Sequence, residues 1–250
     1  SVGQGVETVF SQIAGDALDM PMDCIREVRH GSTTLLKQGY GSYSSRSIVM
    51  GGSAIVEAQL VWYGLPFTFE PVGDLFKEPD AKLRLEKVNP LAQVPTLVMP
   101  DGTVMSESAA ITLLLADIAG NDSLVPAPGA PERGKFLRWL VFIVANIYPT
   151  FTYADDPSRF VSVNAARDPF RAATDAYAQR LWKQLDGAAG GPWFLGERFS
   201  ALDVYIDVMT RWRPKRSWFE TETPGLFAIA RRADRKPELA AVWKRNWPEG

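Results

Sequence analysis

The sequence predicts an α/β domain followed by a helical domain, on the evidence of three segments. Residues 88–115 fit a loop, a strand, a turn, a second strand and a helix, in that order. Residues 120–133 form a dense run of proline, glycine and polar side chains, which is typical of a linker. Residues 134–147 and 168–185 carry the apolar patterns of helices, so the second half of the chain is expected to be helical.

The strand, turn, strand and helix segment is assigned from its local chemistry. Thr96–Met99 and Thr103–Met105 are short runs of strand formers, and Pro100–Gly102 between them favours a tight turn. Ser106–Ser108 then open a helix, whose unpaired N–H groups attract a carboxylate. Pro95, just before the first strand, suits a strand entry or a cis peptide bond. The segment either holds an extended ligand with an acidic end or is a capped helix that binds nothing.

The composition excludes several classes of protein. The chain has 250 residues, of which 46% are hydrophobic, enough for one large or two small domains. The net charge is −2 with no basic tail, which argues against nucleic acid or an anionic membrane as the main partner. The apolar runs are too short to span a bilayer, and no signal peptide is visible. With Cys24 and His30 as the single cysteine and histidine, we expect a reducing compartment and no metal site or Ser-His-Asp triad.

The sequence VNPLAQVPTL, followed by DGTVMSESAAI, resembles the glutathione-binding domain of the glutathione S-transferase family. The resemblance runs from about residue 58 to the C-terminus. It implies a thioredoxin-like α/β N-terminal domain plus an all-α C-terminal domain, which together make the glutathione transferase fold. It also implies that Val94 and a cis Pro95 pair through their backbone with the cysteinyl part of glutathione, and that Glu107 and Ser108 hold its γ-glutamyl end. With Gln93, these residues form the expected glutathione site.

Residues 1–58 resemble a different family. GQGVETVFSQIAGDAL and GYGSYSSRSIVMGGSAIVEA are similar to a fragment of the large subunit of molybdenum hydroxylases, the xanthine and aldehyde dehydrogenases. In that family the positions that match Gly3–Gly5 and Ser44–Ser47 contact the molybdopterin cofactor. The family's catalytic glutamate and remaining cofactor site have no counterpart in this chain, so no metal is expected. From composition alone, the Gly/Ser loop at 39–47 is either a phosphate cradle or a flexible linker.

The two resemblances meet near Ile55–Gln59 and define the expected domains. These are an atypical N-terminal extension at 1–45, a thioredoxin-like glutathione-binding domain at 46–120, a linker at 121–133 and an all-helical substrate domain at 134–250. In the transferase pattern, Ile48–Met50 form the first strand and Phe67–Val72 the second. In the molybdenum hydroxylase pattern, Ile48–Met50 are helical, and the sequence leaves both alternatives open.

The second half of the chain contains a strong helix-start signal. Ser200 and Asp203 have the spacing of a capping box, and Phe199 and Val204 have that of a hydrophobic staple. The resemblance places such a pair at the start of the buried core helix of the transferase family and implies a role in folding rather than in chemistry.

Glutathione conjugation needs a thiolate at neutral pH, whereas a free thiol has a pKa of about 8.5. A side chain that donates a hydrogen bond to the sulfur favours the anion. Ser53, expected to open the first helix beside Gly51–Gly52, is the candidate catalytic residue, with Tyr43 and Ser47 as alternatives. A plain N-cap is the competing interpretation of Ser53. The expected electrophile pocket lies between the domains, and ordinary core packing is the competing interpretation of its walls. The expected walls are Trp139, Phe142, Tyr148 and Tyr153.

Two functions are consistent with the sequence. The first is a cytoplasmic, homodimeric glutathione transferase with a role in detoxification, which conjugates or reduces small hydrophobic electrophiles with glutathione as co-substrate. The second is a non-catalytic binding or scaffold protein of the same shape, because the expected first strand and catalytic loop are atypical. Glutathione binding without conjugation favours the second function.

Overall fold

The computed structural model describes residues 47–73, 75 and 78–248, and Ser45–Gly250 form one compact unit. The expectations for residues 1–46 lie outside the described residues. The first part of the unit holds α2 (Ser47–Tyr63), α3 (Pro79–Glu86), β1 (Leu97–Val98), β2 (Val104–Met105) and α4 (Ser108–Ala119). The second part holds α5 (Arg133–Phe142), η2 (Ile143–Ile147), α6 (Tyr148–Asp155), η3 (Pro157–Arg159), η4 (Asn164–Ala166), α7 (Arg167–Asp186), α8 (Ala201–Thr210), α9 (Arg216–Glu222), α10 (Pro224–Ala233), η5 (Pro237–Leu239) and α11 (Ala240–Asn246).

Helix α2 is the element on which both parts of the unit pack. Its residues 54–60 are all buried. Ala54, Ile55 and Ala58 belong to the large core of the helical part, whereas Val56 and Leu60 belong to a smaller cluster with α4. The helix ends at Gly64, where φ is +66° and the N–H of Leu65 donates to the carbonyl of Leu60 at 3.0 Å. A helix buried on two faces at once explains why its sequence is apolar nearly all round.

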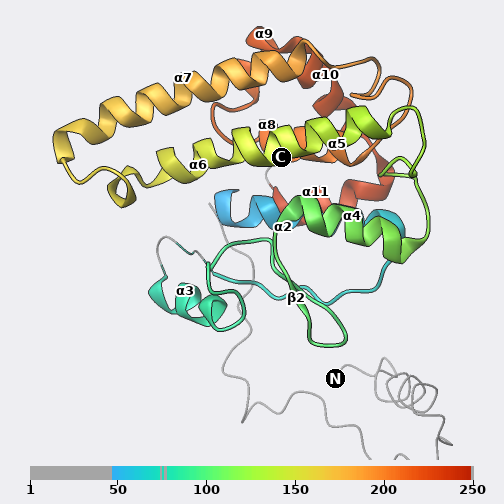
Figure 1. Ribbon diagram of the computed structural model, residues 1–250, viewed down its shortest axis with the longest axis horizontal. Helices are drawn as coiled ribbons and strands as arrows, with labels where there is room; N and C mark the ends of the chain where they lie inside the picture. The colour runs from blue at the N-terminus through green and yellow to red at the C-terminus, as the bar shows by residue number, and fades with distance from the viewer. Residues whose placement is uncertain (1–46, 74, 76–77, 249–250) are drawn as a thin grey trace, which may run out of the picture. The chain divides into compact units, whose positions relative to one another are not determined.

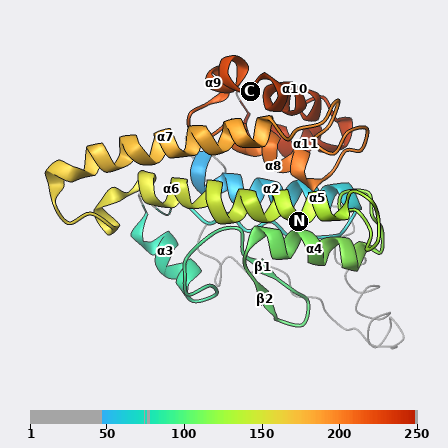
Figure 2. The ribbon, with the colours of Figure 1, turned by 45° about the horizontal axis from the view of Figure 1, so that its top comes forward.

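The predicted hairpin and the helix that follows it are confirmed. β1 and β2 are antiparallel, with Leu97 opposite Met105 and Val98 opposite Val104. The 100–102 turn closes with the Gly102 N–H donating to the Met99 carbonyl at 2.9 Å. Leu97 and Met105 face the cluster of Val56, Leu60, Ile111 and Leu115, while Val98 and Val104 are exposed. The alternation of faces along each strand therefore seats the hairpin against α2 and α4 (Figure 2).

The helical part is built around α8. Helices α5 and α6 run alongside the long α7 (Figures 1 and 2), and α8 is buried from Ala201 to Thr210. The predicted capping box at its start is confirmed. Asp203 Oδ2 accepts hydrogen bonds from the Ser200 N–H at 2.7 Å and from the Ser200 hydroxyl at 3.0 Å. Asp203 Oδ1 accepts a further bond from the Phe194 N–H at 2.7 Å, so this carboxylate ties the preceding loop to the helix.

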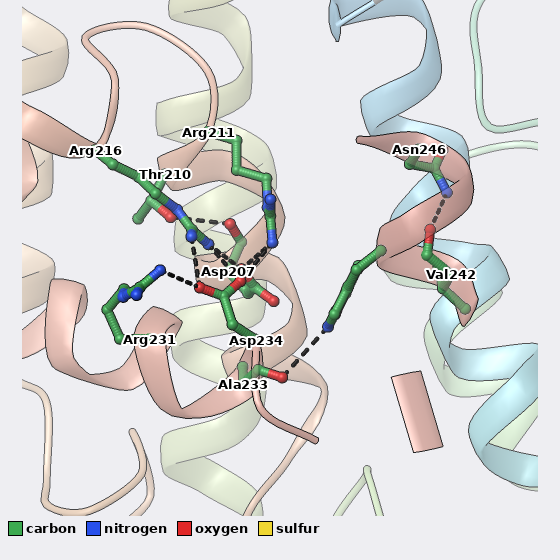
Figure 3. Close-up of polar contacts among 10 residues, drawn as sticks. Asp207, Thr210, Arg211, Arg216, Arg231, Ala233, Asp234, Val242 and Asn246 are labelled. Carbon is green, nitrogen blue, oxygen red and sulfur yellow. Dashed lines mark hydrogen bonds and ion pairs between the residues drawn. The ribbon is translucent and has the colours of Figure 1, made fainter. Parts of the chain in front are cut away.

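A charged cluster around the buried Asp207 joins the end of α8 to α9 and α10 (Figure 3). Arg216 pairs with both Asp207 and Asp234, and its Nη1 lies 2.6 Å from Asp234 Oδ2. Arg211 pairs with the same two aspartates, and Arg231 Nη1 lies 3.1 Å from Asp234 Oδ2. None of these five residues lines the cavity described below. We assign the cluster to holding the helices together.

One open alternative is decided and one expectation for the first part of the unit is wrong. Of the two alternatives for Ile48–Met50 the helix is observed, because α2 is helical from Ser47 onward, and Gly51–Gly52 lie inside it rather than in a loop. Phe67–Val72 is irregular rather than a strand. β1 and β2 form the single named sheet in the described residues. A strand depends on hydrogen bonds to a neighbour, and the helical conformation of residues 48–50 removes the neighbour that residues 67–72 were expected to have.

The last part of the chain, from Phe219 to Trp247, is divided into short helices. Pro224 begins α10, and Pro237 begins the short 3₁₀ turn η5 that precedes α11. Proline is favoured in a first helical turn, because its missing N–H would have no partner there. The prolines therefore mark where the segments begin, and the chain changes direction between them.

Candidate glutathione site

A cavity of about 590 Å³ lies between the two parts of the compact unit. One side is formed by residues 91–95 and by Ser106, Glu107 and Ser108 at the start of α4. The other side is formed by residues of η2 and α6 and by Trp212, which follows α8. The structure thus brings together five residues that the sequence assigned to one site: Gln93, Val94, Pro95, Glu107 and Ser108.

The loop before β1 lines this cavity with residues 91–95. The Val94–Pro95 peptide bond is cis, as expected from the sequence, and Pro95 is buried. The backbone N–H and C=O of Val94 make no hydrogen bond within the part of the chain that the structure describes. An extended peptide ligand can therefore pair with both groups in the manner of an added strand.

Asn89 holds this loop in shape, and sequence reasoning did not identify it. Its side chain is 4% exposed, and its Nδ2 donates to the Gln93 carbonyl and to Thr96 Oγ1, both at 3.0 Å. Its Oδ1 accepts from the Leu91 N–H at 3.1 Å. The Asn-Pro pair at 89–90 was a usable signal, because asparagine side chains often bond to the backbone of a turn.

The start of α4 is arranged to receive an anion. Glu107 has φ +64°, a rare value for a residue with a side chain, and no side chain caps the helix. The first N–H groups of α4 therefore lack an intrahelical acceptor, and Ser106, Glu107 and Ser108 at this helix start line the cavity. Glu107 also lines the cavity, so the site offers a carboxylate for a cation beside the helix start that suits an anion.

The aromatic wall of the cavity differs in part from the expectation. Tyr148, Phe151, Tyr153 and Trp212 line it, and Tyr148 and Trp212 meet edge to face with centroids 5.5 Å apart. Trp139 and Phe142 do not line it. Trp139 is 4% exposed and packs edge to face on Phe142 and on Phe194 of the core. Trp139 therefore packs in the core, and Phe142 is half-buried against it, as the competing interpretation has it.

The charged residues of the lining differ in how far they are already paired. Asp155 Oδ1 lies 2.6 Å from Arg213 Nη1, so its charge is compensated within the protein. Lys82 has a loose contact with Glu86 at 3.9 Å, between two exposed side chains. Arg159 makes no ion pair with any residue in the described ranges, and its guanidinium lies over the Phe160 ring at 5.6 Å. Lys82 and Arg159 are thus the cations of the lining that are free to meet a second anionic group.

Comparison with known proteins identifies the family to which this site belongs. The model of the glutathione S-transferase N-terminal domain matches residues 53–118. The chain is 35% identical over 196 residues to the uncharacterized GST-like protein YncG of Escherichia coli, an alignment that covers 78% of this chain and 94% of that protein. The chain belongs to the glutathione S-transferase family. A glutathione transferase homologue from Sulfitobacter, solved with bound glutathione, has the same fold, with a TM-score of 0.63 and 19% identity over 80% of this chain and 94% of that one.

The N-terminal residues of this glutathione S-transferase family member match a second family. The model of the molybdopterin cofactor-binding domain matches residues 1–61 and so overlaps the transferase match within α2. A 60-residue segment is 45% identical to the gamma subunit of the 6-hydroxypseudooxynicotine dehydrogenase complex of Paenarthrobacter nicotinovorans. That match covers 24% of this chain and 7% of the subunit. Gly3–Gly5 and Ser44–Arg46, which match positions that contact the cofactor in that family, lie outside the described residues.

The catalytic residue expected by analogy with the family is not in the cavity. Ser53 does not open a helix, because α2 begins at Ser47 and Ser53 stands inside it. It is absent from the cavity lining. Of the alternatives, Tyr43 lies outside the described residues and Ser47 is the first residue of α2. The position of Ser53 therefore argues against contact with a thiol bound near Val94.

The described residues contain neither a membrane-spanning helix nor a cluster of metal ligands. No helix there combines the length and apolar character that a membrane span requires. The same residues contain no cluster of three or more histidine, cysteine, aspartate or glutamate side chains that could bind a metal ion.

Proposed function

We propose that the protein is a glutathione transferase that conjugates or reduces small hydrophobic electrophiles. The observation that carries this proposal is the joint presence, in one cavity, of the cis Val94–Pro95 loop, the start of α4 with Glu107 and Ser108, and an aromatic wall from the helical part. The family membership supports it, and the alignment to a protein that is itself uncharacterized does not specify the reaction.

The polar side of the cavity matches the charges of glutathione. The carboxylate of the γ-glutamyl end meets the N–H groups and hydroxyl at the start of α4, and its ammonium meets the Glu107 carboxylate. The cysteinyl peptide groups pair with Val94 N–H and C=O. Lys82 or Arg159 receives the glycyl carboxylate, because these are the cations left available in the lining.

The aromatic side of the cavity receives the electrophile. Tyr148, Tyr153, Phe151 and Trp212 offer ring faces and edges beside the place where the thiol is bound. In the reaction the glutathione thiolate forms a bond from sulfur to the electrophilic carbon, and the leaving group departs with the electron pair of the broken bond. Of the phenols on this wall, Tyr153 is the exposed one, so we propose its hydroxyl as a donor to the thiolate.

A second function is favoured by the conformation of α2. The continuous helix from Ser47 leaves Ser53 away from the cavity, so a member of this family with this architecture can bind glutathione without activating it. In that case the protein is a non-catalytic binding or scaffold protein. A homodimeric state and a cytoplasmic location are carried over from the family as further parts of the proposal.

One preparation of the full chain distinguishes the two functions. Glutathione binding is measured by calorimetry, and conjugation is followed with an activated chloroarene such as 1-chloro-2,4-dinitrobenzene. Binding together with turnover that Tyr153→Phe reduces at least tenfold supports the transferase and the assigned donor. Binding without turnover supports the second function. The matched variant Ser53→Ala is expected to keep its turnover, and a loss of turnover with unchanged glutathione affinity would restore Ser53 as the catalytic residue.

A further inference from the structure

Arg213 joins three elements at the edge of the cavity without lining it. It directly follows Trp212, which does line the cavity, in the turn after α8. Its Nη1 lies 2.6 Å from Asp155 Oδ1 at the end of α6, and its Nε donates to Asp175 Oδ1 of α7 at 2.9 Å. Helices α6 and α7 run side by side (Figures 1 and 2), so one guanidinium ties both helices to the residue after Trp212.

The same guanidinium also lies over a ring of the aromatic wall. The central carbon of the Arg213 guanidinium is 5.8 Å from the ring centroid of Phe151, close enough for a cation–π attraction. Phe151 lines the cavity, is 7% exposed and meets Trp212 edge to face, with centroids 5.2 Å apart. Tyr148 packs edge to face on both of these rings. Arg213 is therefore bonded to, in contact with or paired with three lining residues, which are Trp212, Phe151 and Asp155.

Asp155 depends on Arg213 for its counter-charge. It is the last residue of α6, at the negative end of the helix dipole, and the last turn of this helix carries no basic residue. The Asp155 side chain is only 10% exposed, so an unpaired carboxylate at this position is costly. Without Arg213, hydration of this carboxylate would bring water and an uncompensated negative charge to the aromatic side of the cavity, because Asp155 lines it.

We infer that Arg213 is a positioning residue, which holds Phe151, Asp155 and Trp212 in the arrangement that receives the apolar part of the electrophile. The inference rests on the proposed function, in which this wall receives the electrophile beside the bound thiol. Arg213 acts through the lining residues, since it is outside the lining itself. Its loss should weaken the binding of an apolar group on the glutathione sulfur and spare the binding of glutathione itself, whose expected partners lie on the other side of the cavity.

The test compares two ligands by calorimetry of the full chain. Glutathione presents the tripeptide alone, whereas S-hexylglutathione adds an apolar chain on the sulfur. In Arg213→Met, which removes the charge and keeps a long side chain, the affinity for S-hexylglutathione should fall about 4- to 15-fold, as for the lost burial of one or two methylene groups. The affinity for glutathione should stay within about twofold of the wild type.

A second variant reaches Arg213 from outside the cavity. Asp175 does not line the cavity, and its ion pair with Arg213 is its link to the wall. Asp175→Ala should therefore give a smaller loss with the same selectivity for S-hexylglutathione. The double variant Arg213→Met/Asp175→Ala should bind no more weakly than Arg213→Met, because both changes act through one group.

Arg198→Met is the matched control. Arg198 is exposed to a similar degree, 28% against 30% for Arg213, and it is likewise paired with an aspartate, Asp122, outside the cavity lining. This variant should bind both ligands as the wild type does. A loss of S-hexylglutathione affinity as large as that of Arg213→Met would overturn the inference.

The outcomes separate the inference from the proposed function. A selective loss of S-hexylglutathione affinity in Arg213→Met supports the inference, and if that variant does not fold, Asp175→Ala decides. An equal loss for both ligands indicates general damage and overturns the inference, as does a wild type whose affinity the hexyl chain does not increase. Failure of the folded wild-type chain to bind glutathione removes the proposed function and this inference with it. Glutathione binding with an unchanged ratio of the two affinities in the variants removes the inference alone.

Discussion

Glu57 on α2 and Arg245 on α11 form an ion pair between segments that are 188 positions apart. Glu57 is 3% exposed, and it also accepts a hydrogen bond from Asn246 Nδ2 at 2.9 Å. Glu57 lies where the two family matches overlap, at residues 53–61. This contact therefore fixes the junction helix to the end of the transferase domain and makes α2 an integral part of that domain.

The first prediction concerns this ion pair. Arg245→Ala leaves the buried Glu57 carboxylate with Asn246 as its remaining partner. The free energy of unfolding should therefore fall by about 2–3 kcal/mol. This loss is smaller than that expected for a fully buried ion pair, because Arg245 is partly exposed. Urea denaturation measures the change. The double variant Glu57→Gln/Arg245→Ala should recover part of the loss, since it removes the uncompensated charge. A double variant as unstable as the sum of the two single variants would show that the residues do not interact.

The second prediction concerns the pH dependence of stability through Asp203. Burial is the main cause that raises the pKa of Asp203 to about 6 in the folded chain, against the hydrogen bonds that it accepts from Phe194 and Ser200. Its pKa in the unfolded chain is about 3.9. The folded state therefore binds more protons between these values, and the contribution of Asp203 to stability is full below about pH 4 and is lost as the pH rises through 6.

The measurement is urea denaturation of the wild type and of Asp203→Asn between pH 4.5 and 8. The wild type should lose on the order of 2 kcal/mol more than the variant over this range. Asp207, whose pKa burial raises to about 8, acts in the same direction in both proteins, so their difference isolates Asp203. Parallel pH profiles, or a wild type that gains stability with rising pH relative to the variant, would contradict the assignment.

The third prediction concerns Asn89. Asn89→Ala removes three hydrogen bonds that shape residues 91–96, so glutathione affinity should fall about tenfold because the backbone of Val94 is no longer held in place. Calorimetry measures the affinity. Asn121→Ala is a suitable control, since its side chain likewise accepts from the backbone of a turn, at Ser123, but lies outside the cavity. Equal losses of glutathione affinity in the two variants would contradict the proposed role of Asn89 in shaping the site.

The fourth prediction concerns a lysine surrounded by aromatic rings. Lys236 Nζ lies 4.7 Å from the ring centroid of Phe199, 5.2 Å from that of Trp62 and 5.3 Å from that of Trp193. Lys236→Met keeps the length of the side chain and removes its charge, so the free energy of unfolding should fall by about 1 kcal/mol. Lys244→Met, at an exposed position on α11, should change it by less than about 0.5 kcal/mol. Equal stability of the two variants would show that the rings contribute no cation–π energy.

Local chemistry was sufficient to predict part of the fold and most of the polar side of the site. The turn at Pro100–Gly102 and the capping box of Ser200 and Asp203 depend on residues a few positions apart, and both are present in the structure. The cis bond at Pro95 and the joint position of Glu107 and Ser108 at one cavity followed from the resemblance to the transferase family.

The sequence did not decide the conformation of residues 47–53, because one resemblance implied a strand at Ile48–Met50 and the other a helix. The segment has two β-branched residues followed by two glycines, so its local preference for a helix is weak. The rest of α2 is held by packing on both of its faces, and a helix can propagate from that packed region into a segment of weak preference. The strand alternative at Ile48–Met50 underlay the expected strand at Phe67–Val72 and the expected position of Ser53 at a helix start, and neither is observed.

The aromatic wall was only partly predictable, because the helix that carries it is irregular. A π-helical segment, Ile143–Ile147, stands between α5 and α6. A wider turn changes the register of all later side chains relative to a regular α-helix. Periodicity alone therefore does not show that Tyr148 and Tyr153 face the cavity while Trp139 and Phe142 face the core.

The most direct test of the central claim is a calorimetric titration of the full chain with glutathione. We expect saturable binding in the micromolar to millimolar range that Glu107→Ala abolishes or weakens at least tenfold. Glu197→Ala removes the same charge at an exposed position outside the cavity and should bind as the wild type does. Absence of binding by a folded chain, or equal binding by all three proteins, would contradict a glutathione site at Val94, Glu107 and Ser108.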